Sequence, residues 1–209
     1  MPTSPPTTTT TTSPPTPTPT PTFTIHPCTP SDLPSMLSTY TQAFAADPFR
    51  LARYPSTHVP PCIFNRWILG IFTKYLTTPY TSSTKIVEES TGNLAGWTHW
   101  TRPHVLSAEE REQKRVEEER EEVGRRERGE GRFPPGARLE VCEAKVEGWD
   151  RLREKWYRSE DMYLIHYLSI HPTHQHLGLH ASPHPHHRPR RRRIKVLLSR
   201  SHGGRVSRV

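Results

Sequence analysis

Short apolar patterns, alternating in some segments and continuous in another, predict four strands in the middle of the chain. A half-buried strand alternates between apolar and polar residues, whereas a strand that is apolar on both faces is typical of a sheet centre. Segment 162–170 is of the second type, so we expect a central strand covered on each side. Segment 90–93 reads Ser-Thr-Gly-Asn and predicts a turn between two of the strands. The predicted strands are 23–26, 84–88, 94–100 and 162–170.

Apolar residues at helical spacing predict three helices, and charge predicts a fourth. Asp47-Pro48 is expected to end the first helix, and Pro60-Pro61 to begin the second. Segment 107–132 opens with a capping box and continues almost entirely as Glu and Arg, which indicates a solvated helical insertion. The three apolar helices are expected over 33–44, 60–76 and 139–156. This order predicts an α/β (α+β) domain with a mixed, largely antiparallel sheet flanked by helices.

The two ends of the chain have a different composition from this middle. Only 32% of the 209 residues are hydrophobic, and most of the 23 prolines lie near the ends. Residues 1–22 are uncharged Pro, Thr and Ser after Met1, and are expected to be a disordered leader. Residues 181–209 are rich in Pro, His and Arg, hold nine Arg and Lys without an acidic residue, and are expected to be a disordered tail.

Charge, cysteine spacing and hydropathy exclude several classes of protein. The net charge is +8, and since the tail alone contributes nine positive charges, the rest is near neutral and does not resemble a nucleic-acid binder. Cys28, Cys62 and Cys142 lie far apart and suit neither a disulfide framework nor a zinc site. The N-terminal residues lack the pattern of a secretory signal, and the longest apolar stretch, 67–72, is too short to span a bilayer. We therefore expect a cytoplasmic protein that uses no metal and no membrane.

The end of the last predicted strand leads into a distinctive turn. Residues 171–180 read His-Pro-Thr-His-Gln-His-Leu-Gly-Leu-His. Together with the element order, this sequence resembles the acetyl-CoA motif of the GNAT N-acetyltransferase superfamily. Pro172, Gln175 and Gly178 match that motif, while His180 stands where the family has Gly or Ala. Residues 96–103, Gly-Trp-Thr-His-Trp-Thr-Arg-Pro, are similar to the third strand of small fungal-type members, and the resemblance covers residues 23–180.

The resemblance implies where acetyl-CoA would bind. In this family the turn opens a helix whose N-terminal amides hold the CoA pyrophosphate, because unpaired N–H groups and a partial positive charge meet there. The backbone at Leu168 and Ile170 would pair with the pantetheine arm like an added strand. The imidazole of His180 would crowd the phosphates. The residues implied around the pyrophosphate are Gln175, His176, Leu177, Gly178 and His180.

The implied activity is transfer of an acyl group from acetyl-CoA to an amine acceptor, a small molecule or a peptide, without a metal. The tyrosine that serves the family as an acid would lie beyond residue 181, where nothing matches. Segment 162–170 contains no acidic residue, and Asp161 is expected to be structural rather than a base. No catalytic residue is assigned, and we expect the activity of this chain to be impaired.

The tail leaves an alternative open. The family continues after the turn with elements that residues 181–209 do not supply, so we interpret the change of composition as a truncation or a shift of reading frame. The alternative is a non-enzymatic protein: a CoA-binding remnant, or an interaction protein whose basic run 188–195 binds nucleic acid or directs nuclear import. Nuclear localisation belongs to that alternative. The predicted organisation is a leader (1–22), a partial acetyltransferase domain (23–180) and a basic tail (181–209).

Overall fold

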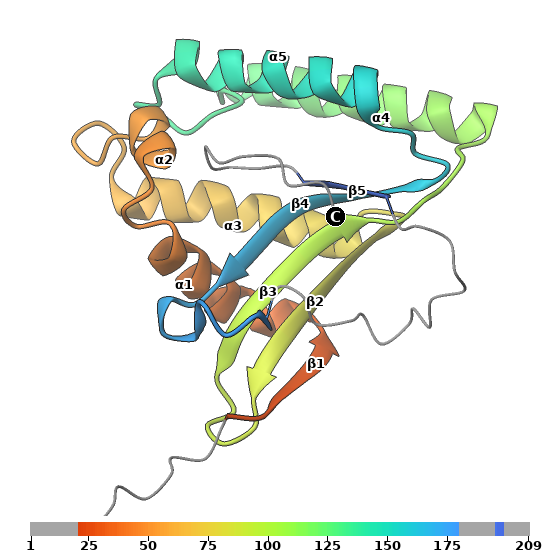
Figure 1. The fold of residues 1–209 in the computed structure, drawn as a ribbon. Coiled ribbons are helices and arrows are strands. Elements are labelled where there is room, and N and C mark those ends of the chain that lie inside the picture. The colour runs from red at the N-terminus through yellow and green to blue at the C-terminus, as the bar shows by residue number, and fades with distance from the viewer. Residues whose placement is uncertain (1–20, 180–194, 199–209) are drawn as a thin grey trace, which may run out of the picture.

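Five strands form one sheet in the order β1-β2-β3-β4-β5 (Figure 1). The computed structural model describes residues 21–179 and the backbone of residues 195–198. Neighbouring strands are antiparallel from β1 to β4, and β5 is parallel to β4. The strands are β1 (Phe23–Pro27), β2 (Thr81–Glu88), β3 (Leu94–Thr101), β4 (Met162–Ile170) and β5 (Lys195–Leu198). The predicted fold class, a largely antiparallel sheet flanked by helices, is confirmed.

Helices form at every predicted position, and one further helix was not predicted. Asp47-Pro48 ends the first helix but also begins α2, because the Asp47 carboxylate accepts the Arg50 N–H at 2.6 Å and proline suits the first helical position. The α-helices are α1 (Leu33–Ala43), α2 (Pro48–Arg53), α3 (Pro61–Thr77), α4 (Ala108–Glu127) and α5 (Leu139–Trp156). Two 3₁₀ turns are η1 (Pro30–Asp32) and η2 (Pro172–His174).

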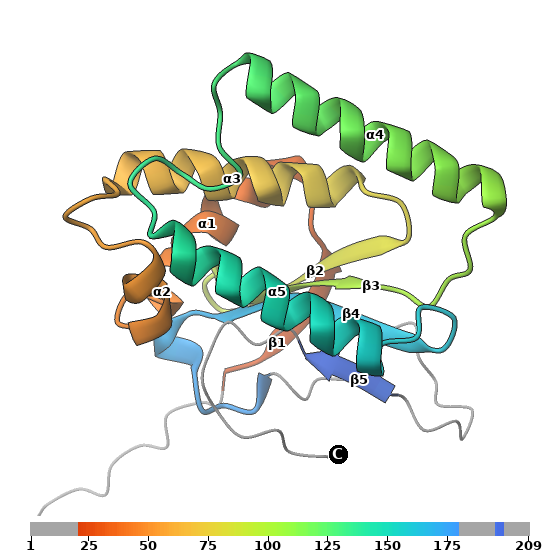
Figure 2. The ribbon, with the colours of Figure 1, turned by 90° about the horizontal axis from the view of Figure 1, so that it is seen from above.

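The core lies between one face of the sheet and helices α1 and α3, which Figure 2 shows on the same side of the sheet. Trp97 of β3 is its centre. Its indole N–H donates to the Met36 carbonyl at 3.0 Å, and its ring meets the edge of Phe72 with centroids 4.7 Å apart. Both contacts fix the helices to the sheet. The buried hydrophobic cluster is Met36, Tyr40, Tyr54, Val59, Phe64, Ile68, Phe72, Trp97 and Cys142.

Helix α4 contains no buried residue, as its charged sequence predicts. Ser107 and Glu110 form the predicted capping box at its start. Lys74 of α3 reaches Glu121 at 2.6 Å, and the Tyr80 hydroxyl donates to the Glu110 carboxylate. None of the described helices is long and apolar enough to cross a membrane.

One expectation for the C-terminal part needs correction. The face of β4 that carries Leu168 is only partly covered, because Leu168 remains 38% exposed while Leu164 on the opposite face is 1% exposed. Within the tail, Lys195–Leu198 pairs with Met162–Ile165. These residues include the apolar run of the tail, and the pairing satisfies backbone groups at the edge of β4. The leader up to residue 20, the rest of the tail and the proposed change of frame lie outside the described residues.

Candidate functional site

A β-bulge places two consecutive side chains of β4 on the same face of the sheet. His99 of β3 pairs with Tyr167 and Trp100 pairs with Ile165, which leaves His166 as the extra residue. The rings of His166 and Tyr167 both approach Tyr75 of α3, with centroids 5.6 and 5.7 Å away. Side chains of a regular strand would point to opposite faces. The bulge therefore divides β4 into a first half, 162–165, and a second half, 167–170.

The second half of β4 directs backbone groups away from β3. The His171 N–H donates to the Ala95 carbonyl at 2.8 Å, so the backbone at this position faces β3. Backbone direction alternates from residue to residue in an antiparallel strand. The N–H and C=O groups of Ile170 and Leu168 therefore point toward the opposite edge of β4.

Within the described part of the chain, only part of this edge has a neighbouring strand. The described strand β5, Lys195–Leu198, pairs with the first half of β4. The Gln175 side-chain amide donates to the Ile170 carbonyl at 3.1 Å. Among the described residues, the N–H and C=O of Leu168 and the N–H of Ile170 have no backbone partner. The structure thus brings together three of the residues implied by the resemblance, Leu168, Ile170 and Gln175, at one edge.

The turn after β4 is described only as far as Leu179, and His180 lies outside the described residues. His176 and Gly178 adopt left-handed backbone angles, with φ of 66° and 73°. A right-handed helix does not accommodate such residues, so the helix that follows this turn in the GNAT motif does not form within residues 175–179. A Cβ at Gly178 would meet no atom within 4 Å, and the side chains of His176 and Leu177 are exposed. The turn is therefore open on the side of Gly178.

His171 and His174, at the start of this turn, contact α1 and the sheet. His174 Nε2 lies 3.4 Å from the Glu88 carboxylate, and its ring meets the edge of Phe23 with centroids 5.8 Å apart. His171 Nε2 lies 3.0 Å from Gln42 Oε1 of α1. Both histidines therefore hold the turn in place through contacts with neighbouring elements. Among the described residues no group of three His, Cys, Asp or Glu side chains gathers as metal ligands would.

Two histidines, the buried His99 and the half-buried His166, form a cluster on the helix-covered face. His99, 1% exposed, bonds Ser83 Oγ through Nδ1 at 2.7 Å and stacks on Tyr75 with centroids 4.2 Å apart. Burial lowers the pKa of His99 to about 3. Burial, followed by the charge of Arg153, lowers the pKa of His166 to about 4. Both imidazoles are therefore neutral at physiological pH.

Sequence analysis did not single out this cluster as functional. The one available signal was the alternation Trp97-Thr98-His99 in β3, which places His99 on the same face as the central tryptophan. Asp161, the acidic residue next to β4, is exposed and paired with Arg158 at 2.5 Å. This pairing agrees with the structural role expected for Asp161.

No family model matches the chain, and no curated protein matches it. Among solved structures, the chain is similar to one described as histone acetyltransferase HPA2 and related acetyltransferase from Corynebacterium glutamicum. The two are 15% identical with a TM-score of 0.39, over 76% of this chain and 66% of that chain. The chain thus spans just under two thirds of that protein's length. We therefore base the fold class on the strands and helices of the chain itself.

Proposed function

We propose that this protein transfers an acyl group from acetyl-CoA to an amine acceptor, as GNAT-type N-acetyltransferases do. The supporting observation is the second half of β4, where a backbone edge at Leu168 that has no strand partner among the described residues continues into an open turn at Gly178. The hydrogen bond from Gln175 to the Ile170 carbonyl joins this edge to the turn. An extended chain with regularly spaced amides and an anionic end fits such an arrangement.

Each part of this region has a definite role in the proposal. The Leu168 N–H and C=O would bond the amides of the pantetheine arm as an added strand does. The left-handed Gly178, which has free space around it, would allow close approach of the phosphates. Bound acetyl-CoA supplies the activated acetyl group that the amine attacks. The nearest side chains able to exchange a proton are His166 and Tyr167, which precede Leu168 on β4.

A Leu168→Pro substitution tests the backbone edge. Proline removes the N–H that we assign to pantetheine, and it is tolerated at a strand edge where that N–H points outward. We expect acetyl-CoA to raise the thermal midpoint of the wild-type chain in a concentration-dependent manner. In Leu168→Pro the dissociation constant, measured by calorimetry, should rise about tenfold, the value of one lost hydrogen bond of ~1.4 kcal/mol.

Leu168→Ala is the matched control, because it shortens the same side chain but keeps the N–H. Its affinity for acetyl-CoA should stay within about threefold of the wild type, since the proposed contact is made by the backbone. If the wild-type chain shows no response to millimolar acetyl-CoA, the proposed function is wrong. Equal losses in Leu168→Pro and Leu168→Ala would instead place the binding contact on the side chain.

A further inference from the structure

Three cationic side chains gather where α2 lies beside the beginning of α5 (Figure 1). Arg50 and Arg53 belong to α2, and Lys145 belongs to α5. The Asp47 carboxylate caps α2 through the Arg50 N–H and also acts on Lys145. Among the described residues, three positive charges therefore gather beside this one carboxylate.

An aromatic ring lies near each of these cations. The Arg50 guanidinium lies 4.7 Å from the centre of the Phe64 ring. The Arg53 guanidinium lies 4.5 Å from the centre of the Tyr54 ring and donates a hydrogen bond to the Tyr54 hydroxyl. Lys145 Nζ lies 6.0 Å from the centre of the Phe49 ring. Ring contacts attract a cation, but they do not cancel its charge.

Burial makes this excess of positive charge costly. The Nε atoms of Arg50 and Arg53 are buried and have no hydrogen-bond acceptor among the described residues. Burial, followed by the charge of Arg53, lowers the pKa of Lys145 to about 8. A buried charge without a counter-charge destabilises the folded state. The Nε–H groups without acceptors and the charge of Lys145 therefore reduce the free energy of unfolding, whereas hydrogen bonds to Tyr54 and Cys142 stabilise the charge of Arg53.

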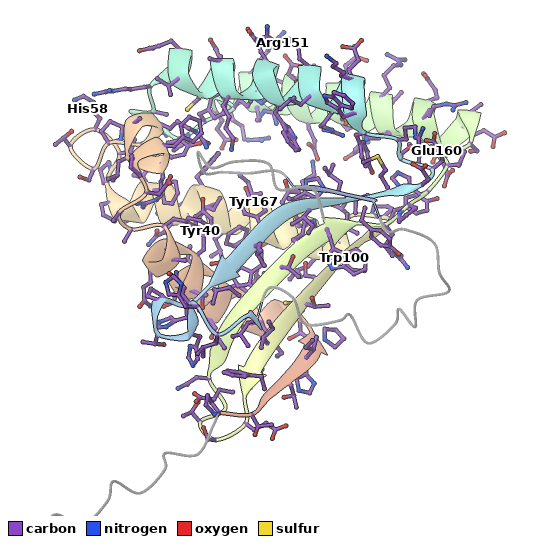
Figure 3. The ribbon with its side chains drawn as sticks, in the orientation of Figure 1. Tyr40, His58, Trp100, Arg151, Glu160 and Tyr167 are labelled. Carbon is purple, nitrogen blue, oxygen red and sulfur yellow. The ribbon has the colours of Figure 1, made fainter. Side chains whose placement is uncertain are left out.

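The cationic group lies close to the second half of β4. Its Arg53 charge acts on the phenols of both Tyr40 and Tyr167. These two rings are in edge contact with centroids 5.9 Å apart, and Figure 3 labels both. Tyr167 immediately precedes Leu168, the residue that we assign to the pantetheine arm. Tyr167 thus lies between the cationic group, through Arg53, and the proposed donor edge at Leu168.

We propose that Arg50, Arg53 and Lys145 bind an oxyanion of the acyl acceptor, a carboxylate or a phosphate. Guanidinium groups suit both anions because their N–H donors match a pair of oxygens. The acceptor is then an amine that carries an acidic group, such as an amino acid, an acidic peptide or a phosphorylated amine. That the anion is part of the acyl acceptor rests on the proposed function. That these three side chains bind an anion does not rest on it.

Thermal denaturation of the full chain with inorganic phosphate or with succinate tests the binding, without acetyl-CoA. Measurements at pH 7 keep Lys145 protonated, and constant ionic strength removes general salt effects. At least one of the two anions should raise the wild-type midpoint. The double variant Arg50→Gln with Lys145→Met should need about tenfold more anion for the same rise, because it removes two of the three charges.

Two controls separate binding from folding. Arg66→Gln removes an exposed charge of α3 and should respond like the wild type. Without anion, the double variant should be at least as stable as the wild type, because it removes uncompensated charge. A response only to phosphate would indicate a phosphorylated acceptor, and a response only to succinate a carboxylate.

The proposal is overturned if neither anion raises the wild-type midpoint, or if the double variant responds as the wild type does. Its failure is distinguishable from failure of the proposed function. Anion binding without any acetyl-CoA response would reject the acyltransferase while retaining the anion site. Acetyl-CoA binding without an anion response would reject the anion site while retaining the proposed acyltransferase.

Discussion

The two halves of β4 share an apolar sequence but have different surroundings. The first half lies between β3 and β5 and buries Met162 and Leu164. The second half pairs with β3 alone among the described residues and leaves Leu168 partly exposed. The bulge at His166 separates them. Apolar residues thus stabilise the fold in the first half of β4. In the second half, similar residues lie along a backbone edge that has no strand partner in the part of the chain that the structure describes.

This difference shows that the environment, rather than the hydrophobicity, sets the role of each residue. A strand inside a sheet has all of its backbone groups paired, so its side chains contribute mainly packing. A strand edge retains free donors and acceptors, which can pair with another extended chain. Substitutions that affect the two halves unequally test this distinction.

The largest effect is expected for Leu164→Ala in the first half. Leu164 is 1% exposed, so its truncation removes buried contacts and leaves a cavity. The free energy of unfolding, measured by urea denaturation, should fall by about 3 kcal/mol. The same truncation at Leu168 should cost less than about 1 kcal/mol, because that side chain is already partly in water. Equal losses at both positions would refute the distinction between the halves.

A smaller effect is expected for Gly96→Ala, which acts on the second half from β3. A Cβ at Gly96 would lie 2.5 Å from Ile170 Cδ1 and 2.9 Å from the Ser169 carbonyl oxygen. Because that oxygen belongs to the backbone, the second half would have to shift, at a cost of about 2 kcal/mol. We also expect weaker acetyl-CoA binding, measured by calorimetry.

Gly148→Ala in α5 is the control for this substitution. A Cβ there would meet no atom within 4 Å, and alanine is the better helix former. The control should therefore raise the free energy of unfolding by up to about 1 kcal/mol. If the Gly96→Ala protein is as stable as the wild type, the second half of β4 shifts without lowering the free energy of unfolding.

The smallest effect is a pH dependence that arises at the bulge. Burial lowers the folded-state pKa of His99 to about 3 and of His166 to about 4, both below the ordinary value of about 6.5. The unfolded chain therefore binds more protons below pH 6.5, and stability falls as the pH falls. Between pH 7 and pH 6 we expect a loss of about 0.7 kcal/mol for each histidine.

Urea denaturation at several pH values between 7 and 6 measures this dependence, in a range where carboxylates remain ionised in both states. His99→Asn should show about half of the wild-type slope, because one of the two titrating groups is gone. An unchanged slope would mean that His99 becomes protonated in the folded state as easily as in the unfolded one.

Local pattern determined most of the secondary structure from the sequence alone. Short apolar patterns located β1 to β4, and the helical repeat located α1, α3 and α5. Capping residues and charge located α4. Helix α2 was not predicted, because its six residues are too few to show a helical repeat. In addition, Asp47-Pro48 both ends one helix and begins the next. The edge residues Leu168, Ile170 and Gln175 were named from a resemblance, and their contact became visible only in the fold.

Only the tertiary structure decided which side chains meet. Cross-strand register produced the bulge at His166, and the neighbour of each strand determined which backbone edge stays free. The excess of positive charge arose because α2 and α5, far apart in sequence, pack side by side. Periodicity reports which face of an element is apolar, and it contains no information about the partner of that face. Sites built from several elements therefore depend on packing, whereas the elements themselves follow from local sequence.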